Sequence, residues 1–503
     1  MRLHRVVFAL LSVFTLCSVY AAAEDAEYLF RLRPGAADTL DLPDMDVRPV
    51  CAAEDVYVTG NESLVRSLDS EGLLFYYENN GLVSLMDYGP DLAALSAEAW
   101  THAMLGADYA MERGNGGEGV RIGIIDSGLM SEFSAYSDVM VVPGINYCAA
   151  APSWDTEAVI WKRFVEEEAW RSAQGDEALK KYFEAWQTDL PARYDTSDQV
   201  GHGTFVASIL ASREEGICPK TELVPLKCFT GMKNGSIGDI VAAIYDAVDV
   251  YHCQVINLSL GVTMEYRTLR DAAVYAFQHG VILAASAGND RRYTYYPAAY
   301  DGVVSVGAVD GNKQVFTMSS RSESLWITAP GVSVPALDQS TGNFVNKNGT
   351  SFSAPFVSAA AALALSADPS LSPAGFQDLL AETAEDLGDP GRDMDYGFGL
   401  LNLGLLLAAV TGDSGTAIPS YYNNTLCLSA WKPPAENDVV WAARYAADGR
   451  FLSLEACSGT GGISNLPLSE DAPALLLMGL DRDTLSPLRE AVRYGGSLEE
   501  GKT

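Results

Sequence analysis

Between about residues 91 and 412 the chain alternates short apolar runs with helical segments, and this alternation constrains its fold more than any other feature. The runs are rich in β-branched residues, as in Val120–Asp126, Cys253–Gly261 and Gly280–Gly288. Helical segments such as Ser236–Val248 separate them. Continuous apolar runs predict strands buried on both faces, so we expect an α/β fold with a mostly parallel central sheet flanked by helices.

The remainder of the 503 residues divides into smaller units. Residues 1–23 have a basic start, an apolar run and three closing alanines, which is typical of an export signal and predicts a secreted, extracellular protein. Residues 24–90 predict a small α+β unit, and residues 413–503 predict a small β-rich appendage with a tail. The α/β region then spans residues 95–412. The strands expected in the two small units are Glu27–Leu32, Leu73–Glu78, Asp438–Tyr445 and Arg450–Cys457, and the helix is Asn61–Leu68.

Residues 149–195 interrupt the alternation with a stretch rich in charge and tryptophan. Within it, four apolar side chains follow i, i+3, i+4, i+7 spacing and share one helix face: Leu179, Tyr182, Phe183 and Trp186. A helical hairpin docked on the main body explains the pattern. A lid or substrate-binding element explains it too, because insertions on a scaffold often carry specificity.

Charge and cysteine content exclude several classes of function. The formal net charge is -33, and nucleic acid is not an expected partner because phosphate binding needs Lys and Arg. After the signal no stretch is long and apolar enough for a membrane helix, so no stable membrane insertion is expected. The eight cysteines form no C-x-x-C pair, which argues against a zinc or redox site. Their pairing stays open, since export permits disulfides and buried free thiols fit equally well.

Three short motifs carry residues that can do chemistry. Asp126 ends an I-I-D-S-G run, His202 lies in G-H-G-T, and Ser351 lies in N-G-T-S-F-S-A-P before a helix of small residues. Each motif lies at a strand end or a helix start, and in an open α/β sheet such ends share one edge. A serine hydroxyl becomes a nucleophile when an imidazole removes its proton and a carboxylate orients the imidazole. Taken singly, the aspartate is an ordinary turn residue and the serine an ordinary helix cap.

Together the three motifs resemble those of the subtilisin family of serine peptidases, the subtilases, in wording and in the order Asp, His, Ser. The resemblance covers about residues 95–412. It implies a subtilisin-like fold and a serine endopeptidase that hydrolyses peptide bonds through an acyl-enzyme intermediate, with Asp126, His202 and Ser351 as its catalytic triad. It also implies protein or peptide substrates, a monomer and no required cofactor or catalytic metal. A structural calcium ion is compatible with the resemblance, although no calcium loop matches.

Two further motifs extend the resemblance. The segment A-S-A-G-N, which ends at Asn289, is similar to the one that supplies the family's oxyanion-hole amide. The segment with Ser259, Leu260 and Gly261 is similar to the strand that pairs with an extended substrate and walls the first specificity pocket. Asp290 has two interpretations: a carboxylate near that pocket, which favours basic or polar residues before the cut, or a solvent-facing turn residue.

Residues 24–90 resemble, less specifically, the propeptide of secreted subtilases. This implies a precursor whose own propeptide acts as an intramolecular inhibitor, with processing expected within residues 87–97, just after V-S-L-M-D. Two rival functions are a lipase or esterase and a non-catalytic binding protein on the same scaffold. This sequence lacks the G-x-S-x-G elbow that a lipase or esterase would have at Ser351. A non-catalytic binding protein on this scaffold usually has lost a member of the triad, and none is lost here.

Overall fold

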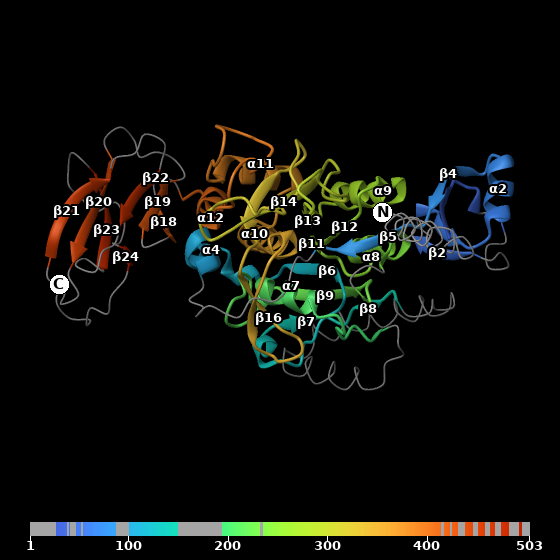
Figure 1. The fold of residues 1–503 in the computed structure, drawn as a ribbon, viewed down its shortest axis with the longest axis horizontal. Helices are drawn as coiled ribbons and strands as arrows, with labels where there is room; N and C mark the ends of the chain where they lie inside the picture. Colours follow the sequence, from blue (N-terminus) through green and yellow to red (C-terminus); the bar gives the residue numbers. More distant parts are fainter. Residues whose placement is uncertain are drawn as a thin grey trace, which may run out of the picture.

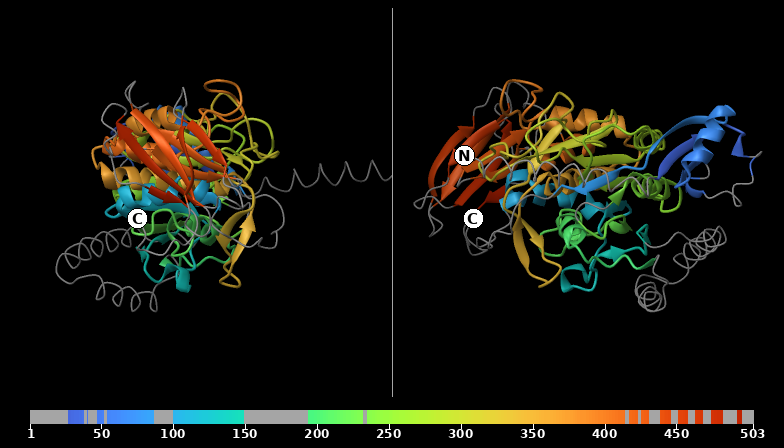
Figure 2. Two further views of the ribbon diagram at one scale, coloured as in Figure 1. Left: turned by 90° about the vertical axis from the view of Figure 1, so that its left-hand side faces the viewer. Right: turned by 45° about the vertical axis from the view of Figure 1, so that its right-hand side comes forward.

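The computed structural model describes residues 27–37, 40, 47–51, 54–86, 100–148, 194–231 and 235–413, and the backbone of strands between residues 417 and 494. The expected signal at residues 1–23, the processing region at 87–97 and nearly all of the insertion at 149–195 lie outside these residues. The described parts form an elongated molecule, with an N-terminal α+β unit at one end, an α/β body in the middle and the C-terminal strands at the other end (Figures 1 and 2).

An eight-stranded sheet forms the centre of the body, with strand order β15-β14-β13-β11-β6-β9-β7 and with β8 paired to β9. All pairings between its described strands are parallel, which confirms the predicted sheet. The strands are β6 (Arg121–Asp126), β7 (Met140–Val141), β8 (Ile145–Asn146), β9 (Glu222–Lys227), β11 (Val255–Leu258), β13 (Ile282–Ser286), β14 (Val303–Val309) and β15 (Ile327–Pro330).

Helices cover both faces of this sheet, so its central strands are buried along their whole length. Their β-branched and small side chains alternate between two apolar cores, one on each face. One face packs against α3 (Trp100–Leu105), α4 (Ala107–Arg113), α7 (His202–Ala211), α10 (Ala354–Ala367), α11 (Pro373–Thr383) and α12 (Leu403–Thr411). The other face packs against α8 (Ile237–Asp249) and α9 (Arg267–Gln278).

Helix α10, with the turn before it, is a long and strongly apolar helical segment of the body. Within the described residues, Thr350–Ala367 is the one helix that is long and apolar enough to cross a membrane, so the expectation that no such stretch follows residues 1–23 was wrong. It is 89% buried inside the fold, and its alanines let the neighbouring helices and the sheet approach closely. Its composition therefore suits the core position that it occupies.

The N-terminal unit is an antiparallel sheet with strand order β2-β3-β1-β4 and one helix. Alternate side chains point to opposite faces: Leu29 packs in the core that includes α8 and α9, whereas Phe30 packs in a separate core under α2. The described part of this unit therefore combines one sheet with one helix. The elements are β1 (Tyr28–Leu32), β2 (Arg48–Cys51), β3 (Val56–Thr59), α2 (Glu62–Ser70) and β4 (Leu74–Asn79).

The remaining strands form small sheets. Strand β5 (Leu82–Leu85) lies between β10 (Gly235–Ser236) and β12 (Leu260–Gly261), and β16 (Val334–Leu337) pairs with β17 (Phe344–Lys347). At the C-terminal end, the alternating runs form two antiparallel sheets, β18-β19-β22 and β21-β20-β23-β24. Their strands are β18 (Ala417–Tyr422), β19 (Thr425–Ala430), β20 (Asp438–Tyr445), β21 (Phe451–Cys457), β22 (Ile463–Pro467), β23 (Ala474–Asp481) and β24 (Val492–Tyr494).

The cysteines whose side chains the structure describes, in the N-terminal unit and the body, are free thiols, and of these only Cys148 is exposed. The buried ones are Cys51, Cys218, Cys228 and Cys253. Burial raises the pKa of Cys51 to about 12, so this thiol stays protonated and behaves as a small apolar side chain. Within the same residues, no group of three or more His, Cys, Asp or Glu side chains is placed to hold a metal ion.

Candidate active site

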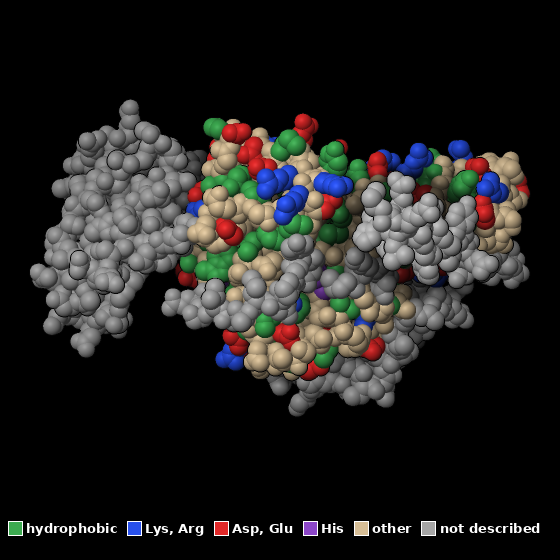
Figure 3. Space-filling model, in the orientation of Figure 1, with side chains coloured by type: hydrophobic (Ala, Val, Ile, Leu, Met, Phe, Trp, Pro, Cys, Tyr) green, Lys and Arg blue, Asp and Glu red, His purple; other side chains and the backbone are tan. Residues whose placement is uncertain are grey.

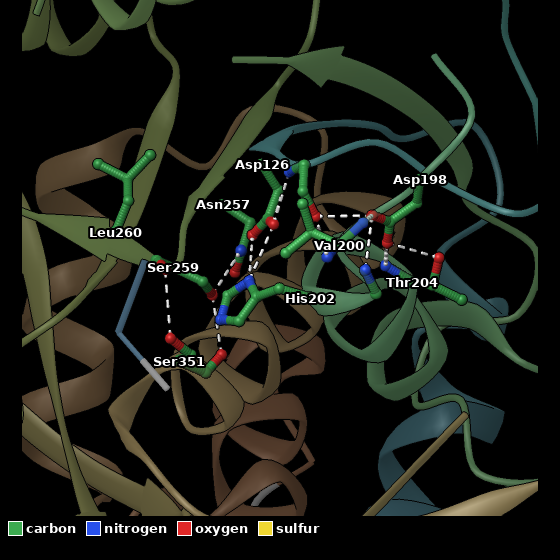
Figure 4. Close-up of polar contacts among 12 residues, drawn as sticks. Asp126, Asp198, Val200, His202, Thr204, Asn257, Ser259, Leu260 and Ser351 are labelled. Atoms are coloured by element: carbon green, nitrogen blue, oxygen red, sulfur yellow. Dashed lines mark hydrogen bonds and ion pairs between the residues drawn. The ribbon is translucent and has the colours of Figure 1, made fainter. Parts of the chain in front are cut away.

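Asp126 and His202 meet at the carboxyl edge of the central sheet. Asp126 ends β6 and His202 begins α7, and both are almost fully buried, at 0% and 1% exposure. The imidazole Nδ1 lies 2.8 Å and 2.9 Å from the two carboxylate oxygens. Because an ionised carboxylate only accepts hydrogen bonds, we assign the proton on this side of the ring to Nδ1. Figure 4 shows the ring between Asp126 and Ser351.

A second buried carboxylate, Asp198, fixes the start of α7. Its oxygens accept hydrogen bonds from the backbone N–H groups of residues 200, 201 and 204, at 2.8–2.9 Å, and from the hydroxyls of Ser127 and Thr204. The Ser127 hydroxyl also accepts from the Gly203 N–H at 2.9 Å. Asp198 and the Ser127 hydroxyl together therefore tie the end of β6 to the start of α7. Figure 4 shows Asp198 beside Val200 and Thr204.

The loop that carries Asp198 is anchored by a buried lysine at the end of β9. The Lys227 Nζ donates to the carbonyl of Ser197 at 2.5 Å and to the side-chain oxygen of Gln199. Burial lowers the pKa of Lys227, and the nearby carboxylates of Asp195 and Asp198 act in the opposite direction. Asp126 of β6 and Lys227 of β9 are partners in the register of these two parallel strands. The Lys227 ammonium therefore compensates negative charge near Asp126.

Ser351 lies in the helical turn just before α10 and is fully buried. Its Oγ donates to the Ser259 carbonyl at 3.2 Å, and the Ser259 Oγ donates back to the Ser351 carbonyl at 2.8 Å. Asn257, at the end of β11, donates to the Ser259 hydroxyl at 3.0 Å and accepts from Ser358 of α10 at 2.9 Å. These contacts fix the serine turn against the edge of the sheet.

Asn289 follows β13, and its side chain and the Ser351 N–H are directed at the same carbonyl oxygen, that of Met86. Its Oδ1 accepts from the Thr350 N–H at 3.0 Å and from the Thr350 hydroxyl at 3.1 Å, so its NH₂ group points away from that residue. The Nδ2 donates to the Met86 carbonyl at 2.6 Å. The Ser351 N–H reaches the same carbonyl oxygen at 3.3 Å. One carbonyl therefore lies between two donors beside the serine.

Met86 ends an extended segment that runs through the site. Strand β5 pairs antiparallel with β12, where Leu85 faces Leu260 and Ser84 faces Gly261, and with β10 on its other side. The Met86 N–H donates to the Ser259 carbonyl at 3.2 Å and continues the ladder. Residues 82–86 thus bind as an added strand between two edges of the body, which is how extended peptides are commonly recognised.

The sequence matches the subtilase family, Peptidase S8, over residues 117–399, which is more than half of the chain. The chain belongs to the subtilase family. This subtilase is 31% identical to Subtilisin DY of Bacillus licheniformis over 310 residues, which cover 60% of this chain and 95% of that protein. It is 26% identical to a thermostable alkaline protease of Halalkalibacterium halodurans over 392 residues, covering 76% and 92%. It is 29% identical to Subtilisin Savinase of Lederbergia lenta over 312 residues, covering 60% and 96%.

As a subtilase, the protein is a serine-type endopeptidase that acts on proteins or peptides, as the motifs predicted. The structure brings five predicted residues to one point: Asp126, His202, Ser259, Asn289 and Ser351. It places Leu260 and Gly261 in β12, against the extended segment.

Sequence reasoning missed two groups in this subtilase. Asp198 lies four residues before His202, and its position after a turn-forming stretch gave no signal of the five donors that meet it. Met86 belongs to the segment V-S-L-M-D, which precedes the predicted processing region, but nothing in the sequence indicates that its carbonyl accepts a hydrogen bond from Asn289. Both connections arise between elements that are distant in sequence.

Proposed function

We propose that this subtilase hydrolyses peptide bonds through an acyl-enzyme intermediate, with Asp126, His202 and Ser351 as the triad and Asn289 as an oxyanion-hole donor. We propose further that it is made as a precursor that cuts its own chain at the bond between Met86 and Asp87. Asp87 itself lies outside the described residues. The proposed bond precedes the predicted processing region, residues 87–97, by one position.

The position of the Met86 carbonyl carries this proposal. Its oxygen accepts from the Asn289 side chain at 2.6 Å and from the Ser351 N–H at 3.3 Å. Those are the donors that a substrate carbonyl needs as its oxygen becomes negative. A carbonyl held there presents its carbon to the serine turn, so the bond after Met86 is the one exposed to attack.

The side chains supply each step of the reaction. The Ser351 hydroxyl turns from the Ser259 carbonyl toward His202, and its oxygen attacks the Met86 carbonyl carbon while the imidazole Nε2 takes the proton. The carbonyl electrons move to the oxygen, where Asn289 and the Ser351 N–H donate to the oxyanion. Asp126 holds the ring and stabilises the imidazolium.

The second half of the reaction releases both products. When the oxyanion collapses, the bond to the following nitrogen breaks, and His202 returns its proton to the departing amine. The Met86 acyl group remains as an ester on Ser351. A water molecule, deprotonated by His202, then attacks this ester and restores the serine, leaving a free carboxylate on Met86. No cofactor takes part in these steps, and a structural calcium ion stays a prediction.

Contacts of the N-terminal unit support its role as an intramolecular inhibitor. The Glu78 carboxylate accepts from the backbone N–H groups of Arg267 and Thr268 at the start of α9, at 2.9 Å and 2.8 Å. The carbonyl of Gly81 and the side chain of Asn80 accept from the first N–H groups of α8, each at 2.8 Å. The unit therefore seats its strand in the substrate position and satisfies the ends of two helices.

The proposal includes export. Residues 1–23 have the composition of a signal, and a relative that is 25% identical is named Minor extracellular protease Epr, from Bacillus subtilis. The chain spans 48% of that relative's length. A monomer, without nucleic-acid partners and without stable membrane insertion, remains our expectation for the mature protein.

The test is mass spectrometry of the purified protein and of its Ser351→Ala variant. We expect the wild-type chain to yield a mature N-terminus at Asp87 and a separate fragment that ends at Met86. The variant is expected to remain joined at this bond, because the nucleophile is gone while the strand still binds. Cleavage of the variant at the same bond would show that another protease processes the chain.

Labelling with an organophosphonate separates the peptidase from a non-catalytic protein on the same scaffold. We expect the reagent to attach to Ser351 in the wild-type protein and to fail in a folded His202→Ala variant. A folded wild-type protein without label would overturn the proposed chemistry.

A further inference from the structure

The side chain of Met86 is enclosed by the body, and its methyl end and Tyr295 both lie beside Gly261. Met86 is 4% exposed. A Cβ placed on Gly261 would lie 3.0 Å from the Met86 Cε and 3.0 Å from the Tyr295 Cβ. The methyl end of Met86 and the Tyr295 side chain therefore both lie against β12 at Gly261, where the strand has no side chain.

Tyr295 also lies against a second glycine. A Cβ placed on Gly288, directly before Asn289, would lie 2.8 Å from the Tyr295 Cδ1. Gly288 has a φ of +112°, so a side chain there is disfavoured by the backbone as well as by the ring. The aromatic ring thus spans the space between the two glycines and limits how far a side chain in the position of Met86 can extend.

The ring is held at both of its ends. The Tyr295 N–H donates to the Ala287 carbonyl at 2.8 Å, and the next residue, Tyr296, exchanges two hydrogen bonds with Val262 beside β12, both at 2.9 Å. At the far end the Tyr295 hydroxyl donates to Asp290 at 3.2 Å. Burial and the nearby Asp290 carboxylate raise the pKa of Tyr295, so the phenol keeps the proton that it donates.

Asp290 is occupied by its neighbours. Besides the tyrosine hydroxyl, its carboxylate accepts from the Ser320 hydroxyl at 3.0 Å and from the Arg292 N–H at 2.9 Å. Because it binds the outer end of the Tyr295 ring, the ring lies between this carboxylate and the methionine. A basic side chain in the position of Met86 would have to displace the tyrosine to reach Asp290.

We propose that Tyr295 sets the specificity of this subtilase for the residue before the cut, admitting methionine and leucine and excluding aromatic and basic side chains. This inference rests on the proposed function, since it takes Met86 as the residue before the cut. Flexible, unbranched methionine suits the short, irregular space that the ring leaves. A phenylalanine would need a deeper pocket, which the fixed ring denies.

The test uses five peptide p-nitroanilides that carry the chain's own Leu-Val-Ser-Leu sequence followed by Met, Leu, Phe, Tyr or Arg. For the wild-type protein we expect kcat/KM for Met and Leu to exceed that for Phe, Tyr and Arg by roughly 10-fold or more, which is the usual range for a misfit in an apolar pocket. In Tyr295→Ala we expect the values for Phe and Tyr to rise by roughly 10-fold or more relative to that for Met.

Two variants serve as controls. Tyr295→Phe keeps the ring, and we expect it to keep the wild-type ranking of the five peptides. This variant still tests the role of the ring if Tyr295→Ala fails to fold. Tyr293→Ala removes a tyrosine from the same loop that is 80% exposed, and it should leave the ranking unchanged. Wild-type cleavage of the Phe or Arg peptide as fast as the Met peptide would overturn this inference alone. Failure of the wild-type protein to cleave any peptide would overturn the proposed function and this inference with it.

Discussion

A single buried carboxylate, Asp198, links the strand end that carries Asp126 to the helix start that carries His202. It is 2% exposed and accepts five hydrogen bonds, three of them from backbone N–H groups. It touches no substrate, so its contribution to catalysis is to position the imidazole. Buried donors that lose their acceptor are costly, which makes this residue sensitive to a change of one atom.

Replacing Asp198 with asparagine should therefore lower both stability and turnover. The amide nitrogen cannot accept, so at least one buried donor stays unsatisfied and the free energy of unfolding falls by about 1–3 kcal/mol. We expect kcat, counted per titrated active site, to fall roughly 10-fold or more because His202 shifts. The acid limb of the kcat–pH profile should move as well, which a purely structural defect would not cause.

Asp195→Asn is the matched control for this prediction. Asp195 lies in the same loop but is exposed, and its carboxylate accepts hydrogen bonds from the backbone N–H and the hydroxyl of Ser197. It should leave kcat and the pH profile unchanged. Equal losses in the two variants would mean that the loop, and not the buried carboxylate, sets the geometry.

At the residue scale, the sequence predicted those side chains that stand in short, glycine-containing motifs. Asp126, His202, Asn289 and Ser351 are of this kind, and the structure gathers them. Tyr295 is different because its effect depends on Gly261, which lies far away in sequence. Asp290 shows the same difficulty, since only the fold reveals that Tyr295, Ser320 and Arg292 occupy its carboxylate.

At the scale of elements, the N-termini of α8 and α9 form one part of the contact between the N-terminal unit and the body. Glu78 accepts from two backbone N–H groups of α9, and the Thr268 hydroxyl also donates to it at 2.5 Å. A carboxylate in this position is favoured by the helix dipole, by up to about 2 kcal/mol where it is partly buried. Under the proposed self-cleavage, Glu78 therefore contributes to how long the cleaved N-terminal unit stays bound.

Replacing Glu78 with alanine should release the propeptide sooner. We expect the lag before substrate hydrolysis by freshly processed protein to shorten roughly 10-fold, which corresponds to about 1.4 kcal/mol of lost binding. Glu71→Ala is the control, because Glu71 is exposed and its carboxylate accepts from the Ser67 hydroxyl of its own unit. An unchanged lag in the Glu78 variant would show that the β5 ladder alone controls release.

The larger elements could be predicted and the smallest could not. Strands such as β6, β13 and β20 and helix α8 coincide closely with runs chosen from hydrophobic pattern and caps. Strands β10 and β12 have two residues each, too few for any periodicity of their own, and β12 was expected only as part of the longer run Cys253–Gly261 and from the family resemblance. They exist as strands because β5 pairs with both, so their assignment depends on a segment from another part of the chain.

The whole molecule carries a net charge of -33, although the face in Figure 3 also gathers Lys and Arg side chains near its centre. In such a molecule a partly buried carboxylate is poorly tolerated. Burial raises the pKa of Glu215, and its neighbour Glu214 adds to the rise, while His102 opposes it. One oxygen of Glu215 is buried without a hydrogen-bond partner.

The sign of this shift predicts a pH-dependent gain in stability from Glu215→Gln. A raised pKa in the folded state means that the neutral form stabilises the fold, and this stabilisation disappears as the pH rises through that pKa. At pH 8 the glutamate is charged and the amide is not, so the variant should melt at a higher temperature. The difference should shrink toward zero as the pH falls to about 4, near the pKa of an unfolded glutamate.

Thermal unfolding of both proteins in a Ser351→Ala background measures this difference without self-digestion. Glu214→Gln, at the exposed neighbouring position, is the control and should show no such dependence on pH. A constant difference in melting temperature from pH 8 to pH 4 would contradict the assignment of the effect to the Glu215 charge.

The seating of β5 between β10 and β12 also predicts how the proposed self-cleavage responds to dilution. Under that proposal, nucleophile and first substrate belong to one chain and are already in contact, so the first cut needs no encounter between molecules. Such a step has a half-life that is independent of protein concentration. Every later substrate must arrive by diffusion and compete for the same ladder with the strand that was cut first. One cleft thus serves a unimolecular reaction once and bimolecular reactions afterwards.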